Sequence, residues 1–148
     1  MSENFQKKGL AIILSAPSGG GKSSIARALL AKDTTLVRSI SATTRKPRPG
    51  DIDGKDYFFK SKNDFLKMIN EGKLLEYSEV YGNLYGIPKD FVETQLHQGH
   101  DIIFDIDIQG AQKLKTLLQN SVVSIFISPP SIQVIYLHLS FSKNHFLT

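Results

Sequence analysis

A glycine-rich turn carries the residues of this chain with the clearest chemical meaning. It reads Ala16-Pro17-Ser18-Gly19-Gly20-Gly21-Lys22-Ser23, and Ser24 follows it. Glycines lack a Cβ atom, so backbone N–H groups can approach an anion closely, and a helix that begins near Lys22 adds the positive end of its dipole. A lysine at this position reaches terminal phosphates, and a serine hydroxyl ligates Mg²⁺. The turn therefore predicts a nucleotide phosphate site.

The turn departs from the strict phosphate-loop pattern at one position, where Ala16 replaces the first glycine. A glycine-rich turn that only joins a strand to a helix is the alternative interpretation. The context favours the phosphate loop, because an apolar run at residues 10–15 precedes the turn and an amphipathic segment at residues 24–31 follows it.

Two arginines lie in a proline-rich loop further along the chain, in the stretch Ser41-Ala-Thr-Thr-Arg-Lys-Pro-Arg-Pro-Gly50. Each proline restricts the residue before it to extended conformations. Three residues complete one turn of a polyproline-like stretch, so Arg45 and Arg48 would point the same way. Two guanidinium groups on one side of a stiff loop can clamp a phosphate dianion, although solvated loop arginines are the alternative.

Two aspartates end an apolar run at residues 101–107, which we expect to be a buried strand. Strand alternation would place Asp105 and Asp107 on one face of the sheet. Ligands of open α/β sheets bind at the carboxyl ends of the strands, where a carboxylate can hold Mg²⁺. The alternative is a polar strand end without a ligand.

Glu76 lies in a segment of alternating apolar and polar residues at 74–81. An ionised carboxylate has only acceptors, and guanine offers two adjacent donors, N1–H and the 2-amino group. A buried glutamate can therefore distinguish guanine from adenine. From the local sequence alone, a solvated glutamate on a strand is the favoured interpretation.

The elements that must position these side chains alternate between strand and helix. Alternation of this kind predicts an α/β fold with a parallel sheet, and the short polar strands between residues 38 and 91 predict an inserted lobe. We expect a loop at 43–54, strands at 10–15, 36–41, 56–59, 74–81, 101–107 and 122–128, and helices from Lys22, from the capping box at 61–64 to Gly72, from Pro88 to about 98, and at 109–118.

The composition is that of a single domain with one hydrophobic core. The chain has 148 residues, and 41% of them are hydrophobic. Its formal net charge is +4, but the lysines form no basic stripe, so no nucleic-acid partner is predicted. The absence of cysteine excludes disulfides and thiolate metal sites. No stretch reaches the ~18 apolar residues of a membrane span, and we expect a cytoplasmic protein without a membrane partner.

The order and spacing of these motifs resemble the guanylate kinase family from about residue 9 to residue 131. Bacterial members of that family tolerate alanine at the position of Ala16. The resemblance implies that Ser41 contacts guanine, that Glu76 and Asp107 read guanine N1 and the 2-amino group, and that Asp105 lies near Mg²⁺. It implies a grip on the GMP phosphate by Arg45, Arg48, Tyr57 and Tyr85. Ile87 departs from the family, which usually carries Ser or Thr there, and predicts a weakened guanine contact.

The resemblance also implies a fold and a reaction. The fold would be a P-loop NTPase-type three-layer core at residues 1–37 and 92–131, with a mixed α/β GMP-binding lobe at 38–91. The reaction would transfer a phosphoryl group from ATP, with Mg²⁺, to GMP, giving ADP and GDP. Residues 16–24 would bind ATP, Ser23 and Asp105 the metal, and Lys22, Arg45 and Arg48 would act in catalysis.

Residues 132–148 depart from the family pattern. Family members continue after the Pro129-Pro130-Ser131 motif with an arginine-rich lid, whereas this chain has no arginine after Arg48. We therefore expect the normal lid and C-terminal end to be missing and turnover to be impaired. Two alternatives stay open, a GMP-binding or protein-interaction module and another nucleoside monophosphate kinase. The sequence leaves the oligomeric state undetermined.

Overall fold

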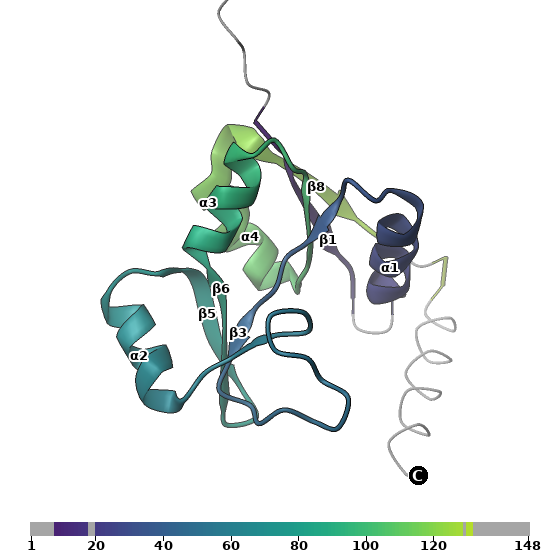
Figure 1. Cartoon of the computed structure of the whole chain (residues 1–148). Coiled ribbons are helices and arrows are strands. Elements are labelled where there is room, and N and C mark those ends of the chain that lie inside the picture. Colours follow the sequence, from purple (N-terminus) through teal and green to yellow (C-terminus); the bar gives the residue numbers. More distant parts are fainter. Residues whose placement is uncertain (1–7, 18–19, 129, 132–148) are drawn as a thin grey trace, which may run out of the picture.

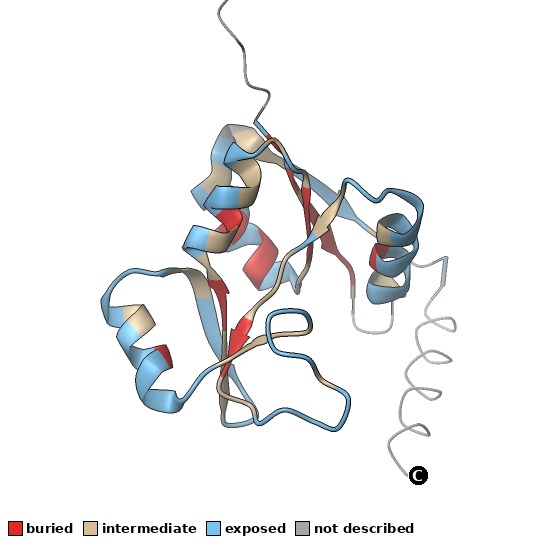
Figure 2. Cartoon of the chain, in the orientation of Figure 1, coloured by how far each residue is buried: buried red, intermediate tan, exposed pale blue. Residues whose placement is uncertain are grey.

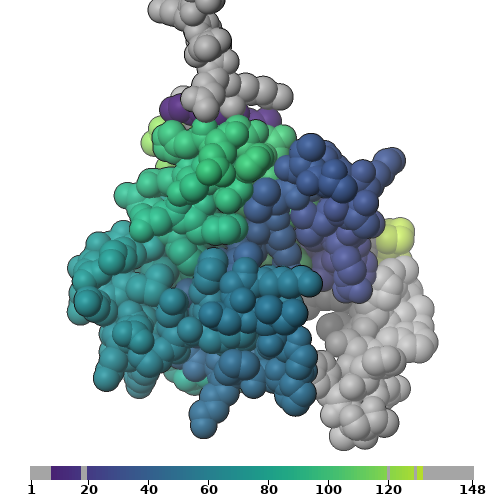
Figure 3. Space-filling view, in the orientation of Figure 1, coloured from purple at the N-terminus to yellow at the C-terminus, as the bar shows by residue number. Residues whose placement is uncertain are grey.

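A computed structural model describes residues 8–17, 20–128 and 130–131 of the chain. Within these residues the strands form two four-stranded sheets, one in the core and one in a lobe (Figure 1). The space-filling view shows the lobe as a separate mass against the core (Figure 3). No helix of the described part has the length and apolar character that crossing a bilayer requires.

The core sheet is parallel, in the order β2-β7-β1-β8. Parallel neighbours require crossover connections, and helices supply them here. The strands are β1 (Ala11–Ser15), β2 (Val37–Arg38), β7 (Ile102–Asp105) and β8 (Val122–Phe126); the helices are α1 (Lys22–Lys32), α3 (Lys89–His97) and α4 (Ile108–Leu118), with a short 3₁₀ turn at Gln119–Ser121.

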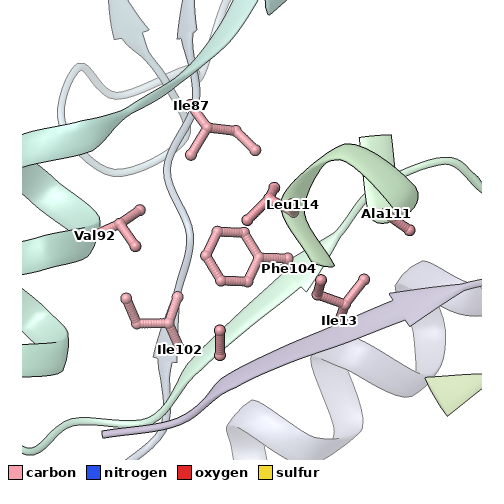
Figure 4. Packing of buried hydrophobic residues seen from close by; sticks show 8 residues of the cluster. Ile13, Ile87, Val92, Ile102, Phe104, Ala111 and Leu114 are labelled. Carbon is pink, nitrogen blue, oxygen red and sulfur yellow. The ribbon is translucent and has the colours of Figure 1, made fainter. Parts of the chain in front are cut away.

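Alternate residues of the central strands belong to two separate hydrophobic clusters. Ile13 and Phe104 face α3 and α4, where they pack with Val92 and Leu114 (Figure 4). Their neighbours in sequence, such as Ile103, face α1 on the other side. This two-residue period places helices on both faces of the sheet, and the predicted three-layer fold is confirmed. The red, buried strands in Figure 2 lie between these helical layers.

The lobe sheet is mixed, in the order β4-β3-β6-β5. Its elements are β3 (Ala42–Thr43), β4 (Phe58–Phe59), β5 (Leu74–Val80), β6 (Asn83–Pro88) and α2 (Lys62–Asn70). The predicted capping box is confirmed, because Ser61 Oγ accepts a hydrogen bond from the Asp64 N–H at 3.0 Å. Phe65 of α2 is completely buried and anchors the helix to the sheet.

A bulge in β5 decides which side chains face the core. Residues Leu75 and Glu76 stand opposite the single residue Ile87 of β6. The extra residue lets Leu75 pack against the main core cluster while Glu76 lines a cavity beside Ile87. Beyond the bulge the pairing is regular, so Ser78 and its partner Tyr85 line the same cavity.

Several predicted elements need correction. The strand expected at 36–41 ends after Arg38, because the chain leaves the core sheet there and enters the lobe sheet at Ala42. The strand expected at 101–107 ends at Asp105, since Asp107 caps α4. Residues 122–128 were expected to form a buried core strand. This expectation of burial is wrong, because four of the five residues of β8 are exposed. Strand β6 was not predicted, since its glycine and proline interrupt the alternation of apolar and polar residues that is typical of a strand.

Candidate nucleotide-binding site

The phosphate loop connects β1 to α1, as predicted. The Gly20 N–H donates to the Pro17 carbonyl at 2.9 Å, and a Cβ at Gly20 would lie only 2.9 Å from the Ala16 Cβ. Gly21 adopts a left-handed backbone (φ 80°) at the N-terminus of α1, where glycine is the least strained residue. No side chain of the described residues caps this end of α1, so its first N–H groups are available to an anion. Ser18 and Gly19 lie outside the described residues.

The side chain of Lys22 meets Asp105 at the end of the neighbouring strand β7. Lys22 Nζ lies 3.2 Å from Asp105 Oδ1, and both side chains are about four-fifths buried, with 21% and 17% exposed. The strand register explains the contact, since Leu14 of β1 pairs with Asp105. The loop lysine and the strand-end carboxylate are therefore brought together at the carboxyl end of the sheet.

Ser23 and Asp105 line one cavity of about 130 Å³, together with Arg27 and Arg38. Asp105 Oδ1 is buried and accepts no hydrogen bond from the described residues, so its contact with Lys22 is one of charge rather than of aligned hydrogen bonding. A carboxylate oxygen with spare lone pairs beside a serine hydroxyl is a donor set suited to Mg²⁺. These two residues thus fit the predicted metal site.

Asp105 and Asp107 do not share a face, which corrects the expectation drawn from strand alternation. Because β7 ends at Asp105, the next residues turn into α4. Asp107 is the N-cap of that helix, and its Oδ1 accepts from the Gly110 N–H at 2.7 Å. It lines a second cavity instead, so the short segment 105–107 contributes one carboxylate to each of two cavities.

The second cavity has a volume of about 120 Å³ and lies between the lobe and the start of α4. Its lining includes five of the residues that the sequence singled out: Ser41, Glu76, Tyr85, Ile87 and Asp107. The Glu76 side chain is 13% exposed and pairs with Lys113 Nζ at 3.5 Å, so the favoured local interpretation of a solvated glutamate is wrong. Two carboxylates therefore flank a small cavity of otherwise mixed lining.

Arg45 lies in a cluster of aromatic rings at one side of this cavity. Its guanidinium carbon is 5.1 Å from the centre of the Tyr57 ring and 5.6 Å from that of Phe59. Tyr57 in turn contacts Tyr85 edge-on, at 6.0 Å between ring centres. The structure thus brings together Arg45, Tyr57 and Tyr85, which are far apart in sequence, and Tyr85 links them to the cavity.

Asp51 fixes this arginine, and the sequence interpretation missed it. Asp51 Oδ2 accepts from Arg45 Nη2 at 2.9 Å and from the Arg48 backbone N–H at 2.8 Å. The backbone hydrogen bond from Arg48, and then the bond from Arg45, lower the pKa of Asp51, and the same carboxylate raises the pKa of Arg45. An aspartate three residues after Arg48, where the loop turns back, was the available signal. The Arg48 side chain is exposed on this loop, so its role stays a prediction.

The fold and the site place the chain in the class of P-loop NTPases, with a phosphate loop, an acidic strand end and a second lobe that carries an arginine cluster. The guanylate kinase family model matches residues 8–143, and the chain belongs to this family. The match extends beyond residue 131, the limit of the resemblance seen in the sequence, into residues that the structure does not describe.

Individual relatives agree with the family assignment. A guanylate kinase of Rickettsia felis is 55% identical over 131 residues, which are 88% of this chain and 68% of that protein. One of Cereibacter sphaeroides is 51% identical over 127 residues, 85% of this chain and 60% of that protein. The crystal structure of guanylate kinase from Anaplasma phagocytophilum superposes with a TM-score of 0.70 at 35% identity, covering 94% of this chain and 72% of that one.

These comparisons confirm the family, the fold class and the kind of enzyme that the sequence predicted. The chain spans roughly two thirds of the length of its relatives, between 60% and 68% for the two proteins named above.

Proposed function

We propose that this chain transfers the terminal phosphoryl group of ATP to GMP, giving ADP and GDP. The observation that carries the proposal is the placement of Asp105 and Asp107. These two residues, separated by one position, line two different cavities, one beside the phosphate loop and one flanked by Glu76. A donor phosphate and an acceptor nucleotide can thus bind on either side of one short segment at the end of β7.

On the donor side, the phosphate loop and the N-terminus of α1 bind the ATP phosphates. Residues 16–24 supply backbone N–H groups, except at Pro17, together with the Ser23 hydroxyl and the Lys22 ammonium. Ser23 and Asp105 would hold Mg²⁺, which would supply neutralising charge to the phosphates. The Lys22 ammonium lies 3.2 Å from Asp105 in this structure. When ATP binds, the ammonium contacts the transferred phosphoryl group instead.

On the acceptor side, Glu76 and Asp107 select guanine. Both carboxylates line a cavity in which a base with two adjacent N–H donors is favoured over one with none. Ser41 and Tyr85 complete the lining, and Ile87 adds an apolar contact where a hydroxyl would bond to the guanine carbonyl.

The GMP phosphate binds at the Arg45 cluster. A guanidinium held by Asp51 and stacked near Tyr57 is preorganised, so less side-chain entropy is lost when a phosphate binds. Arg48 and the hydroxyls of Tyr57 and Tyr85 add donors to the same phosphate. In the transfer step a GMP phosphate oxygen attacks the terminal phosphorus of ATP, the bond to the ADP oxygen breaks, and Lys22, Arg45 and Arg48 stabilise the charge that develops.

A coupled ADP-release assay with GMP, AMP, UMP and CMP tests this proposal. We expect ADP formation that depends on Mg²⁺ and strongly prefers GMP. A preference for another monophosphate would assign the chain to a different kinase of this class. Calorimetric GMP binding with no turnover would instead favour the alternative of a GMP-binding or protein-interaction module.

The expectations on residues 132–148 concern a segment outside the described residues. The absence of arginine after position 48 is a property of the printed sequence, and the impaired turnover expected from it stays a prediction. The steady-state kcat and the GMP affinity of the chain test this prediction. The division into core and lobe, the cytoplasmic location and the absence of a nucleic-acid partner also remain predictions.

A further inference from the structure

Helix α4 carries a second charged side chain toward the acceptor cavity, besides its N-cap Asp107. Lys113 lies three residues after Gly110, which itself lines the cavity, and residues three apart share one helix face. Lys113 Nζ lies 3.5 Å from Glu76 Oε1 on β5, and α4 packs directly against β5. One helix therefore contacts both carboxylates of the cavity, one as its own cap and one through an ion pair.

Glu76 lies between two hollows. On one side it lines the small cavity with Asp107, and on the other side it lines a wider groove with Lys113, Thr116 and Leu117. Lys113 lines the groove and is not among the residues that line the small cavity. Its contact is with Oε1, and a carboxylate has further lone pairs that can accept from donors in the cavity.

The exposures of the two partners differ strongly. The Glu76 side chain is 13% exposed, whereas that of Lys113 is 58% exposed. A largely buried carboxylate that loses its cation must find another partner or turn toward water, while an exposed lysine loses little by itself. Within the described part of the chain, Lys113 is the one cation that pairs with Glu76. The orientation of Glu76 thus depends on Lys113 more than the reverse.

We infer that Lys113 is a positioning residue for base recognition: it holds the Glu76 carboxylate in the orientation that receives the two N–H donors of guanine. This inference rests on the proposed function, because it concerns how the same cavity selects GMP. It predicts that Lys113 affects the affinity for guanine nucleotides and not the binding of a nucleotide whose base has no donors at that edge.

Lys115 offers a matched control on the same helix. It is exposed, lies two residues further along α4 and forms no ion pair with described residues. Lys113→Met and Lys115→Met each remove one charge and keep a strong helix former. Lys113→Arg keeps the charge and tests whether the ion pair is what matters.

The experiment is calorimetric titration of the full chain and these three variants with GMP, with AMP measured by competition. We expect Lys113→Met to weaken GMP about fivefold, the effect of one partly exposed ion pair, and to leave AMP unchanged. Lys113→Arg should restore at least half of the lost affinity, and Lys115→Met should match the parent chain.

Several results would overturn the inference. The first is an affinity of Lys113→Met for GMP within twofold of the parent. The second is an equal loss of GMP affinity in Lys115→Met. The third is an equal loss of affinity for GMP and for AMP in Lys113→Met. The titration also separates this inference from the proposed function. If the parent chain binds GMP and Lys113→Met binds it equally well, only the inference fails; if the parent chain does not bind GMP, both fail.

Discussion

The donor and acceptor sides of this molecule are built in different ways. The donor side comes mainly from one continuous βα unit, residues 11–32, with Asp105 added from β7 and Arg38 from β2. The acceptor cavity collects residues from β5, β6, the start of α4 and Ser41 just before β3, and the loop after β3 adds the Arg45–Asp51 pair beside it. Local backbone geometry is thus enough to form the phosphate loop, whereas base recognition depends on tertiary contacts.

This difference has a consequence for the effects of mutation. A substitution on the donor side removes a charge from the reaction and leaves GMP contacts in place. A substitution on the acceptor side changes GMP binding and, where the side chain also supports the fold, stability as well. Measuring turnover and GMP affinity in the same variants tests that separation.

Lys22→Met should produce the largest loss. The lysine supplies charge to the transferred phosphoryl group, and removing one such cation can cost about 10³-fold or more in kcat. GMP affinity should stay within twofold of the parent, because Lys22 contacts Asp105 and not the acceptor cavity. Coupled ADP-release kinetics with calorimetric GMP titration measure the two effects. A large loss of GMP affinity would show that the two sides are not separate.

Arg45→Met should weaken GMP by about 10- to 100-fold, as expected for a lost charged hydrogen bond of roughly 1.5–3 kcal/mol. Guanosine, which has no phosphate, should bind the variant and the parent equally. Lys46→Met is the matched control, since Lys46 is exposed on the same loop and its carbonyl still accepts from Arg45 Nη1. If guanosine and GMP lose affinity together, Arg45 supports the lobe rather than the phosphate.

Asp107 has two roles that two substitutions can separate. Asn is also a good N-cap, so Asp107→Asn should keep the free energy of unfolding while weakening GMP about tenfold. Asp107→Ala should weaken GMP similarly and also lower the free energy of unfolding by about 1 kcal/mol. Urea unfolding and GMP titration of both variants test this. Equal GMP affinity in the parent and Asp107→Asn would contradict a role in base recognition.

Ile87→Thr should tighten GMP binding about three- to fivefold, because a hydroxyl replaces an apolar contact in the cavity. Ile87 is only 2% exposed and packs in the cluster of Phe104 and Leu114 (Figure 4), so the variant should also lose about 1–2 kcal/mol in free energy of unfolding. Ile87→Val is the control for lost packing without a hydroxyl. An unchanged dissociation constant for Ile87→Thr would show that the position does not reach the base.

Asp51 and Asp33 should give the smallest effects. Hydrogen bonds lower the pKa of both carboxyl groups below the ordinary value of 3.8, from the Arg48 N–H and Arg45 at Asp51 and from the Thr35 hydroxyl and N–H at Asp33. Each carboxylate therefore stabilises the fold above that ordinary value, and this stabilisation is lost as the pH falls through the lowered pKa. Asp51→Asn and Asp33→Asn should therefore each make the free energy of unfolding less dependent on pH at acidic pH.

Only Asp51→Asn should also weaken GMP, by about two- to threefold, because Asp51 holds Arg45 whereas Asp33 lies at the far end of α1. Unfolding midpoints between pH 2 and pH 5, with GMP titration at pH 7, distinguish the two. A GMP effect in Asp33→Asn would point to a general change in the fold.

The two sides also differ in how far the sequence could predict them. The phosphate loop, the capping box at Ser61 and the α/β fold with a parallel sheet follow from local patterns, because backbone preferences and apolar periodicity decide them, whereas the three-layer core was implied by the family resemblance. The prediction that Asp107 lies on the strand beside Asp105 was wrong, because Asp107 follows the end of β7 and caps α4. The burial of Glu76 and its pairing with Lys113 depend on a bulge in β5 and on the packing of α4, which are tertiary features.

The most direct test of the central claim is a transfer experiment with ATP labelled at its terminal phosphate. The full chain is incubated with this ATP, Mg²⁺ and GMP, and the products are separated. We predict labelled GDP that forms only when GMP is present and is lost in Lys22→Met, which still binds GMP. Binding of GMP without labelled GDP, or equal formation of labelled ADP when AMP replaces GMP, would contradict the account.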